Sequence, residues 1–421
     1  MIEKIYDKIT GETSLKYVHP SGTEIFMLPM EGYSSATAQF SVKFGSQDNS
    51  FRTADGEFVK IPDGTAHYLE HKLFESEEKD AFSLFAQTGA SCNAGTSFDY
   101  TQYYFSCADK FAQNLGILLD FVANPYFTEE NVEKERGIIA QEITMYRDNP
   151  SWRVFTNRLE SLYEKNPVRL DIAGTAESIA KITPKTIYDC YNTFYNPSNM
   201  FLCVSGNFDP EDVCRVCEEK LRAGKIHNIE TEPFDEPYAV SKKITRISMP
   251  VAKPIFEIGF KRNAVYGMGE IEDYIYFNIL FDMIFGESSG FYEKMRENGL
   301  LNDEWSVSVF SGRGHLFPTA RGESEKPELI LEEMQKLIRE CKKNPPSEEL
   351  FKRVKKATYG SLVRDFNNVS SVASTLSESA LSGVSPFAAI NTAASADYKT
   401  LLGKLESLDE ENASVSIVEN K

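Results

Sequence analysis

The sequence predicts an α+β chain of two similar domains, each an antiparallel sheet packed with helices. With 421 residues the chain is too long for one ordinary core and suits two. Residues 38–44 alternate apolar and polar side chains, as a half-buried strand does. Octets 128–135 and 347–354 are similar, and each comes shortly after an Asn-Pro pair, which indicates a repeated order of elements. The expected organisation is a first domain at 1–225, a linker at 226–240 and a second domain at 241–421.

The elements of the first half follow from local patterns. Short apolar or alternating runs predict strands, and amphipathic runs bounded by capping or stop residues predict helices. The expected strands lie at 25–28, at 38–44, as a pair within 89–105, and at 199–205. The expected helices lie at 64–74, 79–87, 110–124, 128–146 and 209–222.

Composition limits the class of function. The 45 Lys and Arg against 63 Asp and Glu give a net charge of −18, and such an acidic surface repels phosphate backbones. We therefore expect no nucleic-acid partner. Seven cysteines, an odd number without regular spacing, favour a reducing compartment over a disulfide framework. The sequence has no signal-peptide core and no run approaching 18 apolar residues, so we expect a cytoplasmic protein that does not span a membrane.

Residues 64–74 carry the motif H-x-x-E-H, which holds two of the chain's five histidines. Side chains three and four residues apart share one face of a helix, so His67, Glu70 and His71 converge. Two neutral imidazoles can bind one zinc ion there, and Glu70 can act as general base toward a water molecule. The order of residues is the inverse of the commoner H-E-x-x-H motif. The alternative is two surface histidines on an ordinary helix.

The helix expected at 128–146 offers the further protein ligand that zinc needs. Its apolar stripe includes Val132, Ile139 and Ile143, and Glu135 and Glu142 fall on that stripe, two turns apart. A carboxylate on a buried face must be paired or bind metal. Glu142 is therefore the candidate third ligand, and Glu135 is an auxiliary acid. The alternative is that Lys or Arg side chains neutralise both carboxylates.

Residues 89–105 are rich in small, Thr and aromatic residues and predict two strands. Small side chains at Ala90, Ala94 and Gly95 leave space beside a strand for another backbone, as the addition of a peptide strand to a sheet edge requires. An ordinary hairpin is the alternative.

These motifs resemble the zinc peptidases of the insulinase, pitrilysin and mitochondrial processing peptidase family. The resemblance rests on H-Y-L-E-H at 67–71, N-A-x-T-x-x-D-x-T-x-Y at 93–103 and E-R-x-I-I-x-x-E at 135–142. It covers most of the first half and implies the metallohydrolase fold of mitochondrial processing peptidase. The segments 71–75 and 148–152 are most similar to one bacterial subgroup of this family.

The resemblance also implies a role for each candidate residue. One zinc ion (Zn2+) per chain would be bound by His67, His71 and Glu142. Two carboxylates would be catalytic, with Glu70 as the general base and Glu135 assisting it. The strand at Asn93 and Ala94 would hold the substrate in extended form.

The second half lacks the residues of the metal site. No H-x-x-E-H occurs after residue 71. When the two octets are aligned and extended without gaps, Glu135 falls opposite Val354 and Glu142 opposite Ser361. The second domain is therefore expected to be a copy that kept the fold, lost the metal and covers the site.

The family's second domain commonly carries R-E-x-x-G-L-x-Y, whose Arg and Tyr contact the substrate. Here Arg296 matches the Arg, but the spacing to Gly299 is one residue shorter, and Asn302 or Asp303 stands at the Tyr position. Arg296 is thus a candidate substrate-binding residue without its Tyr partner. Because several two-domain members of the family pair with a zinc-less homologue that supplies both groups, the resemblance implies a heterodimer with such a subunit. A homodimer is the alternative.

The expected function is that of a zinc-dependent endopeptidase, which cleaves peptides or unfolded chains bound in extended form. The resemblance to the bacterial subgroup offers another possibility, a non-proteolytic or regulatory subunit of a complex that modifies a translation elongation factor. A complete motif with both acidic partners argues against a purely structural role, because packing alone has no use for Glu70. A zinc hydrolase acting on non-peptide amides would need no strand-binding site.

Overall fold

The computed structural model describes residues 2–53, 56–75, 80–222 and 228–420, which form two compact units. Neither unit is a continuous stretch of the chain. Unit 1 consists of Met1–Ile143, Asp171–Pro233 and Arg364–Pro386. Unit 2 consists of Thr144–Leu170, Phe234–Val363 and Phe387–Lys421. The units thus differ from the continuous domains expected at 1–225 and 241–421, because each takes a segment from the other half of the sequence.

Unit 1 is built on a seven-stranded sheet with the strand order β1-β2-β3-β9-β4-β8-β7. Its strands are antiparallel neighbours except β3 and β9, which are parallel. A smaller sheet has the order β10-β5-β6. The strands are β1 (Glu3–Tyr6), β2 (Thr13–Val18), β3 (Glu24–Pro29), β4 (Ala36–Val42), β5 (Ser50–Thr53), β6 (Val59–Lys60), β7 (Ser91–Thr96), β8 (Thr101–Cys107), β9 (Met200–Gly206) and β10 (Ile229–Thr231).

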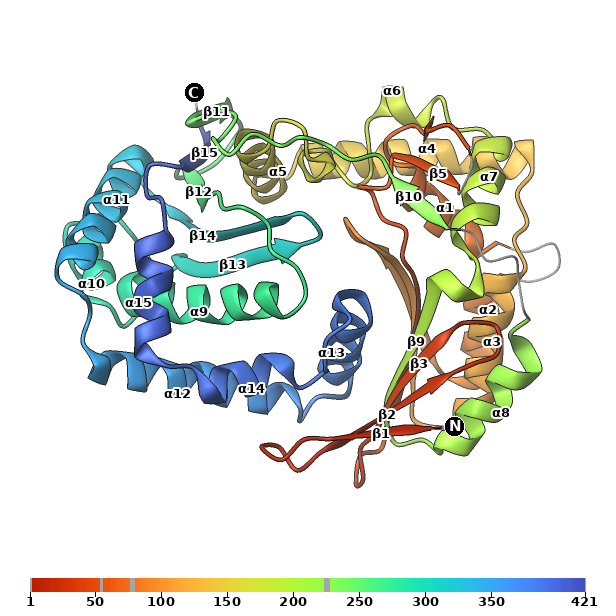
Figure 1. Cartoon of the computed structure of the whole chain (residues 1–421). Helices are drawn as coiled ribbons and strands as arrows, with labels where there is room; N and C mark the ends of the chain where they lie inside the picture. Colours follow the sequence, from red (N-terminus) through yellow and green to blue (C-terminus); the bar gives the residue numbers. More distant parts are fainter. Residues whose placement is uncertain (1, 54–55, 76–79, 223–227, 421) are drawn as a thin grey trace. The chain divides into compact units, whose positions relative to one another are not determined.

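Most helices of unit 1 pack on the apolar face of this sheet, shown from red to green in Figure 1. Alternate residues of β4, Ala38, Phe40 and Val42, belong to the core beneath them. The helices of the unit are α1 (Thr65–Leu73), α2 (Ala81–Thr88), α3 (Phe111–Ala123), α4 (Glu129–Arg147), α6 (Ala176–Ile179), α7 (Pro184–Phe194), α8 (Pro210–Lys220) and α13 (Val369–Ser382), with a 3-10 turn at Pro197–Asn199. The expected start of the second helix, Lys79, lies outside the described residues.

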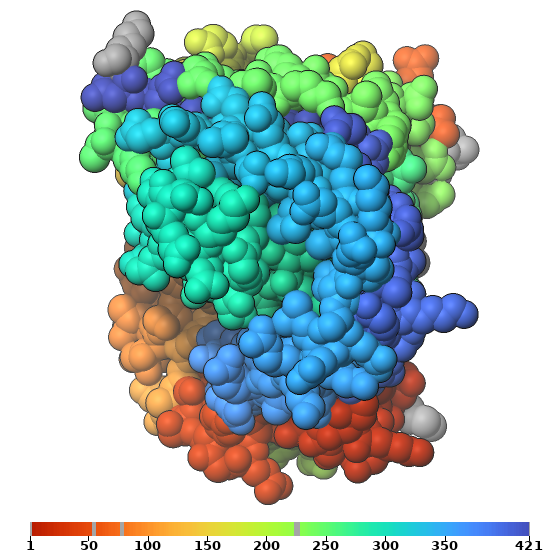
Figure 2. Space-filling model, turned by 90° about the vertical axis from the view of Figure 1, so that its left-hand side faces the viewer, coloured from red at the N-terminus to blue at the C-terminus, as the bar shows by residue number. Residues whose placement is uncertain are grey.

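Unit 2 has a five-stranded sheet with the order β11-β15-β12-β14-β13, in which β11 and β15 are parallel and the other neighbours are antiparallel. Its strands are β11 (Ile244–Ser248), β12 (Ile255–Phe260), β13 (Ser306–Gly312), β14 (His315–Glu323) and β15 (Ala413–Glu419). Its helices are α5 (Pro150–Leu162), α9 (Met268–Phe285), α10 (Gly290–Glu297), α11 (Pro327–Lys343), α12 (Glu348–Asp365), α14 (Ala388–Ser395) and α15 (Tyr398–Ser407), with a 3-10 turn at Pro167–Arg169. Figure 2 shows the outer surface of several of these helices in teal and blue. The predicted fold class is confirmed, and each of the two large sheets adds one parallel pair to it.

Each of the two large sheets is contacted by one helix that comes from the other half of the sequence. Helix α13 packs on β3, β4 and β9 of unit 1, and helix α5 packs on β11, β12 and β15 of unit 2. In unit 2 the packing is close at Gly259, where a Cβ would lie 2.7 Å from Leu162 Cδ1 of α5 and that leucine side chain would have to shift. We call α5 and α13 the exchanged helices.

The predicted repeat extends beyond the two octets. Thr128 and Ser347 occupy equivalent positions, and each hydroxyl accepts a hydrogen bond from the backbone N–H three residues later. Carried on without gaps, the alignment places Asn149 opposite Asn368. These two residues are the N-caps of the exchanged helices α5 and α13.

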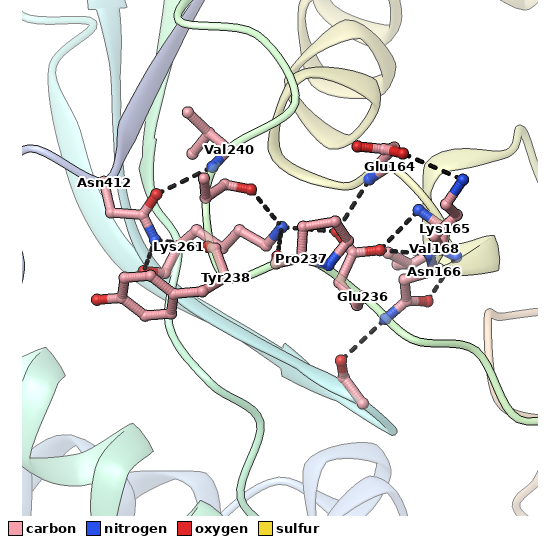
Figure 3. A network of polar contacts seen from close by, with 12 residues as sticks. Glu164, Lys165, Asn166, Val168, Glu236, Pro237, Tyr238, Val240, Lys261 and Asn412 are labelled. Carbon is pink, nitrogen blue, oxygen red and sulfur yellow. Dashed lines mark hydrogen bonds and ion pairs between the residues drawn. The ribbon is translucent and has the colours of Figure 1, made fainter.

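The connector between the two halves is anchored within unit 2 (Figure 3). The Glu236 carboxylate accepts hydrogen bonds from the backbone N–H groups of residues 164–166 at 2.7–2.9 Å. It also forms an ion pair with the buried Lys261 at 2.6 Å. Lys261 also donates to the carbonyl oxygens of Pro237 and Ala239. Of the linker expected at 226–240, the first two residues lie outside the described residues.

None of the helices within the described ranges is long and apolar enough to cross a membrane.

Candidate metal centre

Helix α1 presents the H-x-x-E-H motif. The helix begins after Gly64, whose φ of 91° is left-handed. A Cβ at Gly64 would lie 2.5 Å from the carbonyl oxygen of Ala173, so only glycine fits. His67 and His71 lie one turn apart with ring centroids separated by 4.6 Å. Side chains of His67 and Glu70 are buried, although both are polar, which indicates a built site rather than a solvated helix face.

Helix α4 lies beside α1 and brings two carboxylates to the histidines. Thr128 and Asn131 exchange hydrogen bonds at the start of α4, where the helix expected at 128–146 begins. The hydroxyl of Tyr68 on α1 donates to the carbonyl oxygen of Val132 on α4, which ties the two helices together. Glu135 and Glu142, two turns apart on α4, both reach the motif on α1.

The donor atoms of His67, His71 and Glu142 all lie within 4.8 Å of one another. The carboxylate oxygen Oε2 of Glu142 is 3.7 Å from Nε2 of His67 and 3.4 Å from Nε2 of His71. A tetrahedral zinc ion with bonds of roughly 2.0–2.1 Å separates its ligand atoms by about 3.4 Å. The two nitrogens and one oxygen therefore have the chemistry and the spacing of three ligands of one zinc ion.

Electrostatics at the two histidines differ. Burial and the neighbouring His71 lower the pKa of His67 to about 4, so His67 is a neutral imidazole with a free lone pair. Burial also lowers the pKa of His71, but hydrogen bonds with Glu135 and Glu142 outweigh burial and raise it to about 10. The two carboxylates thus favour a positive charge at this point. A divalent metal ion meets that demand.

Glu135 contacts the other ring nitrogen of His71 and is not part of the cluster of His67, His71 and Glu142. Its Oε1 lies 3.0 Å from Nδ1 of His71, which leaves Nε2 of the same ring facing Glu142. A carboxylate that accepts the N–H of a ligating histidine fixes the ring and its tautomer. Burial raises the pKa of Glu135, but the hydrogen bond from His71 and the charges of His71 and Lys72 outweigh burial and lower it.

Lys72 is a residue of this centre that sequence reasoning missed. Its side chain is fully buried, and its ammonium group pairs with Glu75 at 2.6 Å and lies 3.9 Å from Glu135. A lysine is almost never fully buried without partners. Its position directly after the motif, followed by Leu73 and Phe74, was the available signal, because a charge inside an apolar run needs a partner.

Glu70 points to a different neighbour, the end of strand β7. The hydroxyl of Thr96 donates to Oε2 of Glu70 at 2.7 Å. Burial raises the pKa of Glu70, and hydrogen bonds from the hydroxyl and the backbone N–H of Thr96 oppose the effect of burial. Thr96 was given no role from the sequence, although it is the first Thr of the N-A-x-T-x-x-D-x-T-x-Y motif at 93–103, which was the available signal.

The candidate substrate-binding residues Asn93 and Ala94 lie in β7, the edge strand of the large sheet. Alternate residues of an edge strand turn their backbone N–H groups away from the sheet. The N–H of Ala94 bonds to the side-chain oxygen of Asn93 at 2.9 Å, and the N–H of Thr96, two residues on, faces Glu70. The outward N–H groups of Ala94 and Thr96 are thus bonded to the side chains of Asn93 and Glu70, and the edge ends at Glu70.

Arg296 lies in α10, which belongs to unit 2. Its guanidinium forms an exposed ion pair with Asp303 at 3.1 Å, one of the two residues found where the Tyr is expected. Tyr292 precedes Arg296 by one turn of the same helix. Its hydroxyl contacts the Asp303 carboxylate and donates to the carbonyl oxygen of Asn302. The guanidinium is thus engaged within unit 2.

Comparisons with known proteins agree with this geometry. The family model described as insulinase (peptidase family M16) matches residues 60–176, and the model of the peptidase M16 inactive domain matches residues 181–358. Over 346 residues, or 80% of each chain, the sequence is 39% identical to the "uncharacterized zinc protease YmfH" of Bacillus subtilis (strain 168). It is 24% identical over 320 residues to the "uncharacterized zinc protease YmxG" of the same strain, covering 73% of this chain and 76% of that protein.

Solved structures show the same fold. A candidate M16-like peptidase from Alicyclobacillus acidocaldarius has a TM-score of 0.93 and 32% identity, covering 100% of this chain and 99% of that one. A protease from Helicobacter pylori has a TM-score of 0.82 and 16% identity, with the same coverage. The H-x-x-E-H helix, the paired carboxylates on α4 and these matches lead to one conclusion: the chain belongs to the insulinase family of peptidases, peptidase family M16.

Proposed function

We propose that this chain is a zinc-dependent endopeptidase that cleaves peptides or unfolded chains bound in extended form. The observation that carries the proposal is the place of Glu70, which lies beside the cluster of two histidines and Glu142 and at the end of an open sheet edge. The names of the relatives as zinc proteases support it.

The residues of the site divide the work among them. His67, His71 and Glu142 would hold the zinc ion, whose Lewis acidity lowers the pKa of a water molecule to about 7 and polarises the scissile carbonyl. Glu70 would take a proton from the attacking water and deliver it to the leaving amine. Glu135, backed by Lys72, would keep the His71 ring in the orientation that turns Nε2 to the metal.

The substrate would bind as an additional strand along β7. A peptide paired with the outward C=O group of Ala94, and with its N–H in place of the Asn93 side chain, would run toward Thr96 and so reach Glu70. Backbone pairing carries little sequence information, so we expect weak sequence preference. A bulky side chain at Ala94 should raise KM for all peptides alike, and an effect on one sequence alone would point to a side-chain pocket instead.

The test is a peptide library incubated with the zinc-loaded chain, with the chelated chain and with the Glu70→Gln variant, followed by mass spectrometry of the products. Gln keeps the volume of Glu and removes the base, so we expect zinc to be retained and turnover to fall by roughly 10²–10⁴-fold. His67→Ala is the matched variant that should lose zinc. Equal zinc loss in both variants, or products that survive chelation, would contradict the proposed roles.

We further propose that the active species is a heterodimer with a zinc-less homologous subunit. Support comes from Arg296, whose guanidinium is paired with Asp303, while Asn302 and Asp303 occupy the position where a Tyr is expected. The chain should be assayed alone and with a co-expressed zinc-less homologue from the same genome. Full activity of the single chain, unchanged by the homologue, would leave the homodimer as the remaining pairing.

We place the chain in the cytoplasm. The seven cysteines are all free thiols, in keeping with a reducing compartment. Fractionation of cells followed by immunodetection of the chain tests this placement.

A further inference from the structure

We propose that Thr96 is a positioning residue for Glu70: its hydroxyl holds one carboxylate oxygen of Glu70 and thereby aims the other at the water molecule. The inference rests on the proposed function, which makes Glu70 the general base. It adds a residue that is neither a metal ligand nor a proton acceptor but decides how the base is oriented.

The contact is direct and comes from strand β7, whereas Glu135 and Glu142 reach the motif from helix α4. The Thr96 hydroxyl lies 2.7 Å from Oε2 of Glu70, within the range of a hydroxyl-to-carboxylate hydrogen bond. Glu70 is 8% exposed, so few water molecules can replace this donor. Helix α1 fixes the backbone of Glu70, and the hydroxyl on β7 fixes the far end of its side chain.

Besides Glu70, the Thr96 hydroxyl has one neighbouring side-chain acceptor among these contacts, the hydroxyl of Thr101, and Glu70 is the nearer of the two. Thr101 is the cross-strand partner of Thr96 on β8, and its hydroxyl lies 3.4 Å from that of Thr96. Thr101 donates its own proton to the carbonyl oxygen of Phe44 at 2.8 Å. An ionised carboxylate has no proton to donate, so the Thr96–Glu70 bond needs the hydroxyl as donor.

The position of Thr96 also links the base to the substrate strand. Thr96 is the last residue of β7, the edge on which the peptide would add as a strand. Any shift of β7 moves the donor that orients Glu70. A peptide that pairs correctly with the edge therefore also keeps the base aligned, because one strand serves both tasks.

Two variants separate the hydroxyl from the side-chain volume. Thr96→Val keeps the shape and removes the donor, while Thr96→Ser keeps the donor and removes a methyl group. We expect Thr96→Val to lower kcat about 10- to 100-fold, the factor that corresponds to one hydrogen bond to a charged group. We expect Thr96→Ser to stay within about threefold of the parent, and KM and zinc affinity to stay within about twofold in both variants.

Thr101→Val is the matched control. It removes a hydroxyl that is fully buried on the neighbouring strand and does not bond to Glu70, so kcat should stay within about threefold of the parent. An equal fall in kcat for Thr101→Val and Thr96→Val, equal losses in the Ser and Val variants, or a loss expressed in KM would each overturn the proposal.

Crystal structures of the zinc-loaded parent and Thr96→Val decide the point without an assay. We expect the Glu70 carboxylate to turn or to occupy two positions in the variant, while His67, His71 and Glu142 stay in place. A Glu70 carboxylate in the same single position in both would overturn the proposal. A parent chain that cleaves no peptide would refute the proposed function alone, because the crystal structures would still test the orientation of Glu70.

Discussion

Helices α4 and α12 begin with equivalent caps, at Thr128 and Ser347, and each leads into an exchanged helix through an equivalent Asn. They differ at two positions inside this shared frame. Glu135 of α4 is matched by Val354, and Glu142 by Ser361. Glu135 and Val354 are both buried, so the frame accepts an apolar side chain where α4 carries a charge. Packing thus does not require Glu135, and its chemistry explains its presence.

The largest loss of zinc affinity should come from replacing Glu142 of α4 with serine, the residue at the equivalent position of α12. Glu142→Ser removes one of three protein ligands. If whole sites are worth about 10–16 kcal/mol over four ligands, one ligand corresponds to about 2.5–4 kcal/mol of zinc binding free energy. A zinc titration with a competing chelator measures it. Ser361→Glu is the control on α12, and zinc binding to this variant beyond one ion per chain would show that α12 retains more of a site than we infer.

The faces beneath the exchanged helices offer a second comparison. In unit 1 the contact is neutral, with Gln39 accepting hydrogen bonds from Ser377 at 2.8 Å and Gln102 at 2.9 Å. In unit 2 it is charged, with Arg158 of α5 pairing with Glu257 at 3.0 Å. Both charged side chains are buried. Removing one member of a buried pair leaves the other uncompensated, which makes the charged contact the more sensitive one.

Glu257→Gln should therefore lower the free energy of unfolding by about 3 kcal/mol, at the low end for a broken buried pair because Gln keeps an acceptor for Arg158. Gln39→Met is the matched change beneath α13 and should cost about 1–2 kcal/mol, since two neutral hydrogen bonds are lost. Urea unfolding of both variants compares them. Equal losses would mean that the charge beneath α5 has no special weight.

Replacing Glu135 with valine, the residue at the equivalent position 354 of α12, should lower zinc affinity less than replacing Glu142 does. Glu135→Val should weaken zinc binding about 10- to 100-fold, as the loss of a partner of a ligating histidine does. The fold should tolerate it, because the equivalent position of α12 already holds valine. Zinc affinity and thermal unfolding of the metal-free variant are the two measurements. Loss of folding in Glu135→Val would show that α4 and α12 do not share one frame.

The smallest effect concerns the caps of the exchanged helices. The side chain of Asn149 accepts from the N–H of Ser151 and Trp152, and Asn368 accepts from that of Ser371. Asn149→Ala and Asn368→Ala should each cost about 1 kcal/mol of unfolding free energy, the usual loss for such a cap. Calorimetry of both variants tests whether the two equivalent caps also contribute equally to the free energy of unfolding. A clear inequality would show that the two exchanged helices contribute differently to stability.

Local patterns in the sequence were enough to predict much of the molecule. The motif helix and the stripe on α4 that carries Glu135 and Glu142 each follow from periodicity within one element, and the strand at Asn93 and Ala94 follows from a composition rich in small, Thr and aromatic residues. The exchange of α5 and α13 was not predictable in this way, because it depends on which distant sheet face each helix covers. Thr96 and Lys72 were given no role from the sequence. The partner of Thr96 is Glu70 on helix α1, and the partner of Lys72 is Glu75, which lies just beyond the end of α1.

The exchange of helices also sets a schedule for biosynthesis. Helix α5 ends at Leu162, but strand β15, on which it packs, begins only at Ala413, roughly 250 residues later. At a synthesis rate of about 5–20 residues per second, α5 waits on the order of 10–50 s for its sheet. Arg158 of α5 is buried in the folded chain, where it pairs with Glu257 of β12, so its burial must await the synthesis of that sheet. A charged side chain suits a helix that must remain soluble on the ribosome before it is buried.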